Sequence, residues 1–215
     1  MRGIGGWLCQ EILRVRGIVA RGAYAATIPV MSDSGPTAPG VLRRGLAWFL
    51  DVMLLFSGFV LSQLVVLTPL REALGIDEDA FRAPVFTAGY VLLTVSLPVW
   101  LWLAGWESSR WQATPAKRLL RMRVERVPSG DRPGFRTALG RTLVKLIPWE
   151  LSHLIAIFPT PVYFAAEDAD FRWAFLGPEA LVLGYLLTVV LRKDRRAPHD
   201  LFAGTRVVAV TRPVR

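Results

Sequence analysis

Two long apolar runs constrain this 215-residue chain more than any other feature. Residues 45–67 are interrupted only by Asp51 and Gln63, while residues 83–106 carry no charge and end in a group of tryptophans. A helix needs about 20 apolar residues, at a rise of about 1.5 Å each, to cross about 30 Å of hydrocarbon. Tryptophans are also enriched where a span meets the headgroups. Both runs therefore predict membrane-spanning helices.

Two further segments are candidates for spans. Residues 173–191 hold Glu179 as their one charge, whereas residues 143–164 contain Lys145, Glu150, His153 and three prolines. Taken alone, the 143–164 segment could equally lie in the membrane interface.

The distribution of charge favours spanning for both segments. The chain has 26 Lys and Arg against 17 Asp and Glu, for a formal net charge of +9. Of these cations, 21 lie in residues 1–44, 107–140 and 192–215, and three lie in the connections 68–82 and 159–172. Lys and Arg are retained on the cytoplasmic side, so four spans place every basic segment inside. We expect an all-α, four-helix transmembrane bundle with both termini in the cytoplasm.

Composition also excludes several classes of function. The basic residues are spread over three segments without an aromatic-interleaved patch or a nucleic-acid module, which argues against nucleic-acid binding and favours contact with anionic lipid headgroups. One cysteine and two histidines cannot build an ordinary catalytic zinc site, and no hydrolase or P-loop motif is present. We expect no enzyme activity, no cofactor and no metal site.

The chain divides into three parts. Residues 1–40 form an extension and linker outside the bundle, either a weak amphipathic helix on the inner leaflet or the product of a mis-assigned start, with Met31 as the true first residue. The transmembrane domain covers residues 41–210, and its last part overlaps a basic cytoplasmic tail at 192–215.

Charged side chains inside spans are costly and are functional candidates by default. Asp51 lies about two turns into the first span, and Arg44 precedes it by seven residues on the same helix face, about 10 Å away. In the third span, Glu150 and His153 lie one turn apart, and Lys145 lies near the cytoplasmic interface, where its ammonium can snorkel.

These residues carry a resemblance. The stretch RRGLAWFLDVMLL, with Arg44 and Asp51, resembles the opening helix of the RDD family of bacterial membrane proteins, named for one Arg and two Asp. The similarity continues in order through residues 112–126, 132–146 and 194–208, where Asp200 takes the second Asp position; PWELSH at 148–153 resembles one subgroup. The resemblance implies a multi-pass protein of the bacterial cytoplasmic membrane. Transport is the usual suggestion for this family, with cation/proton exchange for at least one member.

Each candidate has two interpretations. Arg44, Asp51 and Asp200 either form a cytoplasmic-side ion-pair cluster that locks the first helix to the C-terminal segment, or make Asp51 a carboxylate that exchanges a proton for a cation. Glu150 and His153 either join helices by hydrogen bonds or relay protons.

The order Thr-Pro-x-Lys-Arg at 114–118 has a structural interpretation. Thr114 and Pro115 make a good helix start, and Lys117 and Arg118 are explained by contact with the inner leaflet.

The preferred function is transport or exchange of a small solute or cation, through a homo-oligomer because four spans are few for a transporter. The alternative is a non-transporting assembly, stress or interaction factor in the membrane.

Overall fold

Two long apolar helices dominate the computed structural model, which describes residues 37–159, 161 and 174–210. Helix α2 (Val41–Ser62) continues through the π-helical turn η2 (Gln63–Leu67) into α3 (Thr68–Ala73), giving 33 helical residues. After the 3₁₀ turn η3 (Glu78–Arg82), α4 (Pro84–Val91), η4 (Leu92–Ser96) and α5 (Leu97–Ser108) form a second helix of 25 residues. Both are long and apolar enough to cross a membrane, as the sequence predicts.

Prolines account for the two π-helical turns. Pro69 follows η2 and Pro98 follows η4, so the residue four positions before each proline lies within the widened turn. A proline ring clashes with the carbonyl group of that residue and offers it no N–H. The π-helical turn relieves the clash while the helix continues.

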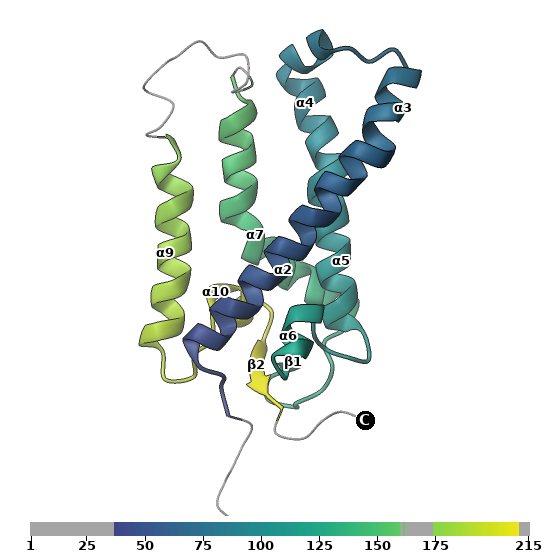
Figure 1. The fold of residues 1–215 in the computed structure, drawn as a ribbon. Coiled ribbons are helices and arrows are strands. Elements are labelled where there is room, and N and C mark those ends of the chain that lie inside the picture. The colour runs from purple at the N-terminus through teal and green to yellow at the C-terminus, as the bar shows by residue number, and fades with distance from the viewer. Residues whose placement is uncertain (1–36, 160, 162–173, 211–215) are drawn as a thin grey trace, which may run out of the picture. The chain divides into compact units, whose positions relative to one another are not determined.

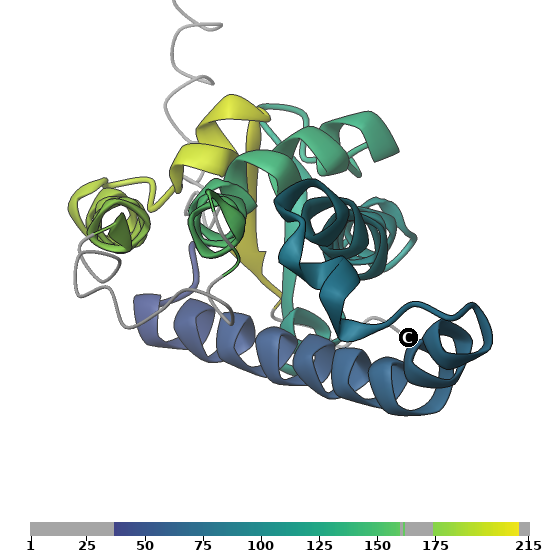
Figure 2. The same cartoon turned by 90° about the horizontal axis from the view of Figure 1, so that it is seen from above.

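Two further helices accompany the long pair. Helix α7 (Phe135–Ile157) begins eight residues before the predicted span at 143–164 and ends before Pro159, so its first half carries Arg141 and Lys145. Helix α9 (Leu176–Leu191) is apolar but has 16 residues, about 24 Å of helix. Seen from above, α7 lies between α9 and α5, and α2 runs along one side of this row (Figure 2). In Figure 1, α2 crosses in front of the row obliquely.

The end of the bundle where α2 starts is closed by a layer of short elements, which we call the basal layer (Figure 1). It consists of α6 (Pro115–Leu119), β1 (Met122–Arg126), α10 (Pro198–Phe202) and β2 (Thr205–Ala209). The strands pair antiparallel, with Met122 opposite Ala209 and Val124 opposite Val207. The all-α prediction is wrong here, because segments about 80 residues apart form this sheet. Residues 198–209 fold against the bundle.

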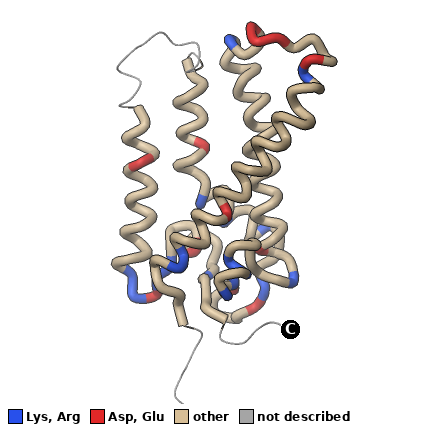
Figure 3. Tube along the Cα trace, in the orientation of Figure 1, with Lys and Arg blue, Asp and Glu red and all other residues tan. Residues whose placement is uncertain are grey.

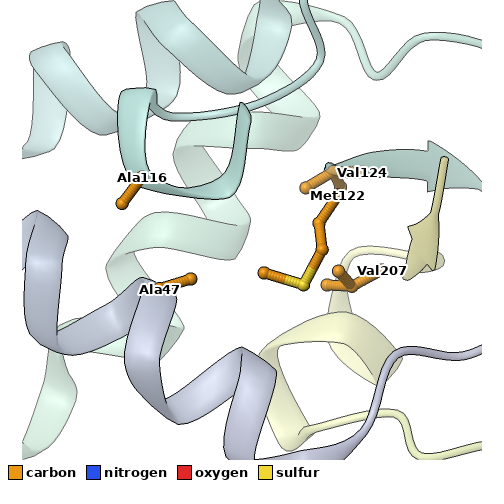
Figure 4. Close-up of a cluster of buried hydrophobic side chains, with 5 residues drawn as sticks. All are labelled: Ala47, Ala116, Met122, Val124 and Val207. Atoms are coloured by element: carbon orange, nitrogen blue, oxygen red, sulfur yellow. The ribbon is translucent and has the colours of Figure 1, made fainter. Parts of the chain in front are cut away.

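The basal layer also holds a small hydrophobic core. Met122, Val124 and Val207 from the strands pack with Ala47 of α2 and Ala116 of α6 (Figure 4). The two small side chains allow the helices to approach closely, so this contact fixes where α2 crosses the layer. The N-terminal amphipathic helix expected within residues 1–40 falls almost wholly outside the described residues.

The long helices expose their apolar side chains. Within the most apolar stretch of each, only 6% of the residues are buried. Such a surface is unfavourable in water and normal in lipid. Lys and Arg gather at the basal end, while acidic residues mark the opposite end near η3 (Figure 3). The mostly helical fold with two long apolar helices therefore indicates a membrane protein.

Candidate functional site

A network of buried ion pairs joins the helices to the basal layer, and Arg141 of α7 is its centre. Its side chain is 1% exposed, and it donates to Glu107 Oε2 at 2.5 Å and to Asp200 Oδ1 at 2.8 and 2.9 Å. Glu107, at the end of α5, also accepts from Lys117 Nζ at 2.5 Å. We call these residues, with Arg44, the Arg141 network. It connects α2, α5, α6, α7 and α10.

Asp200 accepts hydrogen bonds at both oxygens of its carboxylate. In addition to Arg141, it accepts from Arg44 at 2.9 Å, from the Ala197 backbone N–H at 3.2 Å and from the Thr205 hydroxyl at 3.3 Å. Burial by itself raises the pKa of Asp200, but the positive charges of Arg141 and Arg44 outweigh it and hold that pKa well below its ordinary value. The structure thus brings Arg44 and Asp200 together, and they tie α2 to the C-terminal segment.

Two members of the network, Glu107 and Arg141, are absent from the residues that the sequence singles out. The sequence contains a signal that could have identified each of them. Glu107 is the first charge after a run of 24 uncharged residues, and it is acidic in an otherwise basic connection. Arg141 lies one helical turn before Lys145, on the same face.

Asp51 occupies a different environment from the one expected. It is 5% exposed and accepts hydrogen bonds from Thr114 Oγ1 at 2.5 Å and from the Ala116 backbone N–H at 3.3 Å. Within the described residues it has no ion pair, so the expected three-residue cluster contains Arg44 and Asp200 but not Asp51. The carboxylate of α2 instead meets the first turn of α6, where backbone N–H groups lack helical partners.

A cavity of about 270 Å³ lies beside the network, between α2 and the helices α7 and α9. Asp51 and Lys145 both line it, as do Arg44, Lys117 and Arg141. Lys145 is half-buried and, among the residues that the structure describes, has no carboxylate within 4.0 Å. The cavity therefore presents one carboxylate and one ammonium group that no ion pair engages.

His199, from α10, lines the same cavity. Burial, and then the charge of Arg141, hold the pKa of this imidazole well below its ordinary value, so the ring is neutral at pH 7. Its Nδ1 atom is buried without a hydrogen-bond partner in the described part of the chain.

Glu150 and His153 form a second polar cluster, away from the cavity. Glu150 accepts from Ser96 Oγ at 2.7 Å and from Trp100 Nε1 at 3.0 Å, and His153 Nδ1 lies 3.4 Å from its carboxylate. Ser96 is the last residue of the π-helical turn η4. These contacts join α7 to the second long helix, and neither Glu150 nor His153 lines the cavity.

The 114–118 segment is only partly as expected. Thr114 is the N-cap of α6 and accepts from the Lys117 backbone N–H at 3.5 Å, and Pro115 occupies the first turn, which confirms the predicted helix start. The expectation that this segment faces lipid is wrong for two residues, because Thr114 is buried and the Lys117 side chain turns inward to Glu107. Arg118 is exposed and stacks 3.5 Å above the Trp111 ring.

Among the described residues, no three His, Cys, Asp or Glu side chains are close enough together to hold a metal ion. The charged groups that line the cavity are suited to acid–base exchange and to electrostatic binding.

Comparison with known proteins gives one match. The sequence model of the RDD family matches residues 38–204, which include α2, the Arg141 network and every residue that lines the cavity except Val207. No curated protein and no solved structure shows significant similarity to the chain.

Proposed function

The chain belongs to the RDD family, and from that membership and the geometry of its cavity we propose that it transports or exchanges a small solute or cation, with Asp51 as the carboxylate that exchanges a proton. One observation carries the proposal: Asp51 is buried on an apolar helix, lines a cavity, and has no ion pair in the described residues. A carboxylate held by neutral donors can bind either a proton or a cation, whereas one paired with arginine is committed to the anionic form.

In the proposed exchange, the proton and the cation bind the same carboxylate in turn. A cation that enters the cavity binds the Asp51 carboxylate and displaces the proton held there, and a proton that returns from the other side displaces the cation. Thr114 and the first turn of α6 hold the carboxylate in place through both steps. Lys145 lines the same cavity, so its ammonium group competes with the cation for Asp51 and favours release.

The proposal includes a topology of four spans with both termini in the cytoplasm. Two observations support it: the start of α2 and the end of α9 lie at the basal end, and the basic residues gather there (Figure 3). A cytoplasm-specific reporter fused after residue 215 should be active, and an inactive fusion would contradict this topology.

A second candidate is a membrane protein that does not transport. The mutual pairing of Arg44, Glu107, Lys117, Arg141 and Asp200 favours it, because a closed network of ion pairs needs no mobile ion to be satisfied. In that case Asp51 serves only to anchor α6.

Flux measurements separate the two candidates. The full chain is reconstituted in proteoliposomes with an imposed pH gradient, and dissipation of the gradient is followed after addition of Na⁺, K⁺ or Li⁺. Asp51→Asn keeps the shape of the side chain and an oxygen that accepts the hydrogen bond from Thr114. The variant should therefore fold but lose at least about 90% of the cation-dependent flux. Asp79→Asn, an exposed acid in the η3 turn, is the matched control and should retain it. Intact flux in folded Asp51→Asn protein would refute the carboxylate mechanism.

A further inference from the structure

The cavity beside the Arg141 network has a charged base and apolar walls. Its base lies at the basal layer, where Arg44, Lys117, Arg141 and Lys145 line it. The walls rise from the base along one face of α2 and one face of α9, each with members at positions i, i+4 and i+7, so each wall extends about 10 Å. The wall residues are Trp48, Val52 and Leu55 on α2, and Val182, Leu186 and Val189 on α9.

The charges at the base do not cancel. Four cations line the cavity. Three carboxylates lie in it or directly behind it, those of Asp51, Glu107 and Asp200. Glu107 and Asp200 are engaged by Lys117, Arg141 and Arg44, and Asp51 by two neutral donors. Among the described residues, Lys145 is the one of these four side chains that has no carboxylate within 4.0 Å. An ammonium group among apolar walls is costly unless an anion accompanies it.

The walls require a second property of the ligand. A free inorganic anion would satisfy Lys145 but leave the apolar faces of α2 and α9 uncovered, and a neutral hydrocarbon would do the reverse. An amphiphile with an anionic group at the end of an acyl chain satisfies both. A cavity of about 270 Å³ is slightly smaller than an ordinary small-molecule pocket, so it holds a phosphate or carboxylate and the first carbons of a chain.

The arrangement of the helices leaves a path to the bilayer. Helix α2 packs closely on α6, and much less on α7 or α9. The cavity lies in the space that remains, and Trp48 and Leu186 on its two sides are about half exposed. The remainder of an acyl chain can therefore leave the cavity between α2 and α9 and continue among the lipids.

We propose that this cavity binds an anionic membrane amphiphile, whose phosphate or carboxylate pairs with Lys145 and whose first methylenes lie between the apolar faces of α2 and α9. This binding does not depend on transport, because a protein without any flux could hold the same ligand. An anionic phospholipid and a free fatty acid share the required chemistry, and the experiment distinguishes them.

The test measures binding to the full chain, delipidated and held in a neutral detergent. Native mass spectrometry follows retention of dihexanoyl phosphatidylglycerol, with dihexanoyl phosphatidylcholine, decanoate and inorganic phosphate as competitors. Lys145→Met removes the charge and keeps the length of the side chain. Lys193→Met makes the same change at an exposed lysine at the same end of the molecule. Val52→Phe fills the cavity without altering its charge.

Phosphatidylglycerol should bind at least tenfold more weakly to Lys145→Met and Val52→Phe, and within twofold of wild type to Lys193→Met. Phosphatidylcholine and inorganic phosphate should compete poorly. Displacement by decanoate at equal concentration would identify a fatty acid as sufficient, and failure of decanoate would assign the site to a phospholipid; both outcomes support the proposal. Equal binding to Lys145→Met and Lys193→Met would overturn it, as would efficient displacement by inorganic phosphate. If Lys145→Met fails to fold, unchanged binding to Val52→Phe overturns it instead.

Discussion

The Arg141 network and the cavity beside it are both built from buried charges, but they satisfy those charges in opposite ways. In the network, Arg141, Glu107 and Asp200 each contact at least two partners at 2.5 to 2.9 Å. In the cavity, Asp51 is held by neutral donors and Lys145 has no carboxylate within 4.0 Å among the described residues. Charges with complete sets of partners define one structure, whereas charges without ion pairs are available to a ligand.

The difference shows why membrane-embedded charge alone is a poor guide to function. Arg44 and Asp200 are as prominent in the family motif as Asp51, yet they lie in the network and bind α2 to α10. Asp51, seven residues from Arg44, faces the cavity. The partners that a charge has, rather than its depth, separate the groups that hold the helices together from those that no ion pair engages.

Replacement of Arg141 should give the largest effect. Arg141→Met leaves Glu107 and Asp200 buried with one cation each, and loss of one partner from a buried ion pair costs about 3–5 kcal/mol. The variant should therefore unfold at much lower denaturant in mixed micelles, or fail to accumulate. Arg136→Met, an exposed arginine on the same helix, should change the free energy of unfolding by less than about 0.5 kcal/mol. A stable Arg141→Met protein would mean that the network does not hold the helices together.

A change in pH should produce a smaller effect through His199. Because its pKa in the folded protein lies well below the value of the unfolded chain, the unfolded chain binds the extra proton as pH falls below about 6.5. Stability should then fall with decreasing pH, by at most about 1.4 kcal/mol per pH unit, down to the pKa of the folded state. The groups that set this pKa include Arg141, Asp200, Lys145 and Glu107.

His199→Gln should remove the slope between pH 6.5 and 5 and leave the pH dependence of stability at pH 7.5 to 8 the same as in wild type. Asp200 contributes no slope in this range, because its depressed pKa makes its stabilisation disappear only below about pH 4. An unchanged slope in His199→Gln would show that the imidazole titrates normally, and hence that it is not buried beside Arg141.

The sequence predicts the helical parts of this fold well, because each apolar run is a local signal. The helices Val41–Ala73 and Pro84–Ser108 contain the runs at 45–67 and 83–106 almost entirely. The resemblance to the RDD family correctly pointed to Arg44 and Asp200, which the structure places 2.9 Å apart. Thr114 and Pro115 start a helix, as their residue types indicate.

The remaining features depend on contacts between distant segments. The pairing of β1 with β2 joins residues about 80 positions apart, and five-residue strands leave little periodicity to recognise. The contact between Asp51 and Thr114 spans 63 positions, so the spacing of Arg44 and Asp51 gave no indication of it. Glu107 directly follows the apolar run at 83–106, and only the fold shows that Arg141 and Lys117 reach it.

Lys145→Met should have the smallest effect on the free energy of unfolding. Compared with Arg141→Met, it is also the most direct test of the distinction between the Arg141 network and the cavity. Both variants remove one cation from α7, one helical turn apart, and both are measured by equilibrium unfolding in neutral detergent free of lipid. Lys145 has no ion pair to lose, so its replacement should leave stability unchanged or raise it by up to about 1 kcal/mol, while Arg141→Met loses about 3–5 kcal/mol. Equal destabilisation by the two variants would contradict the account, because Lys145 would then be a structural partner and not a free charge in the cavity.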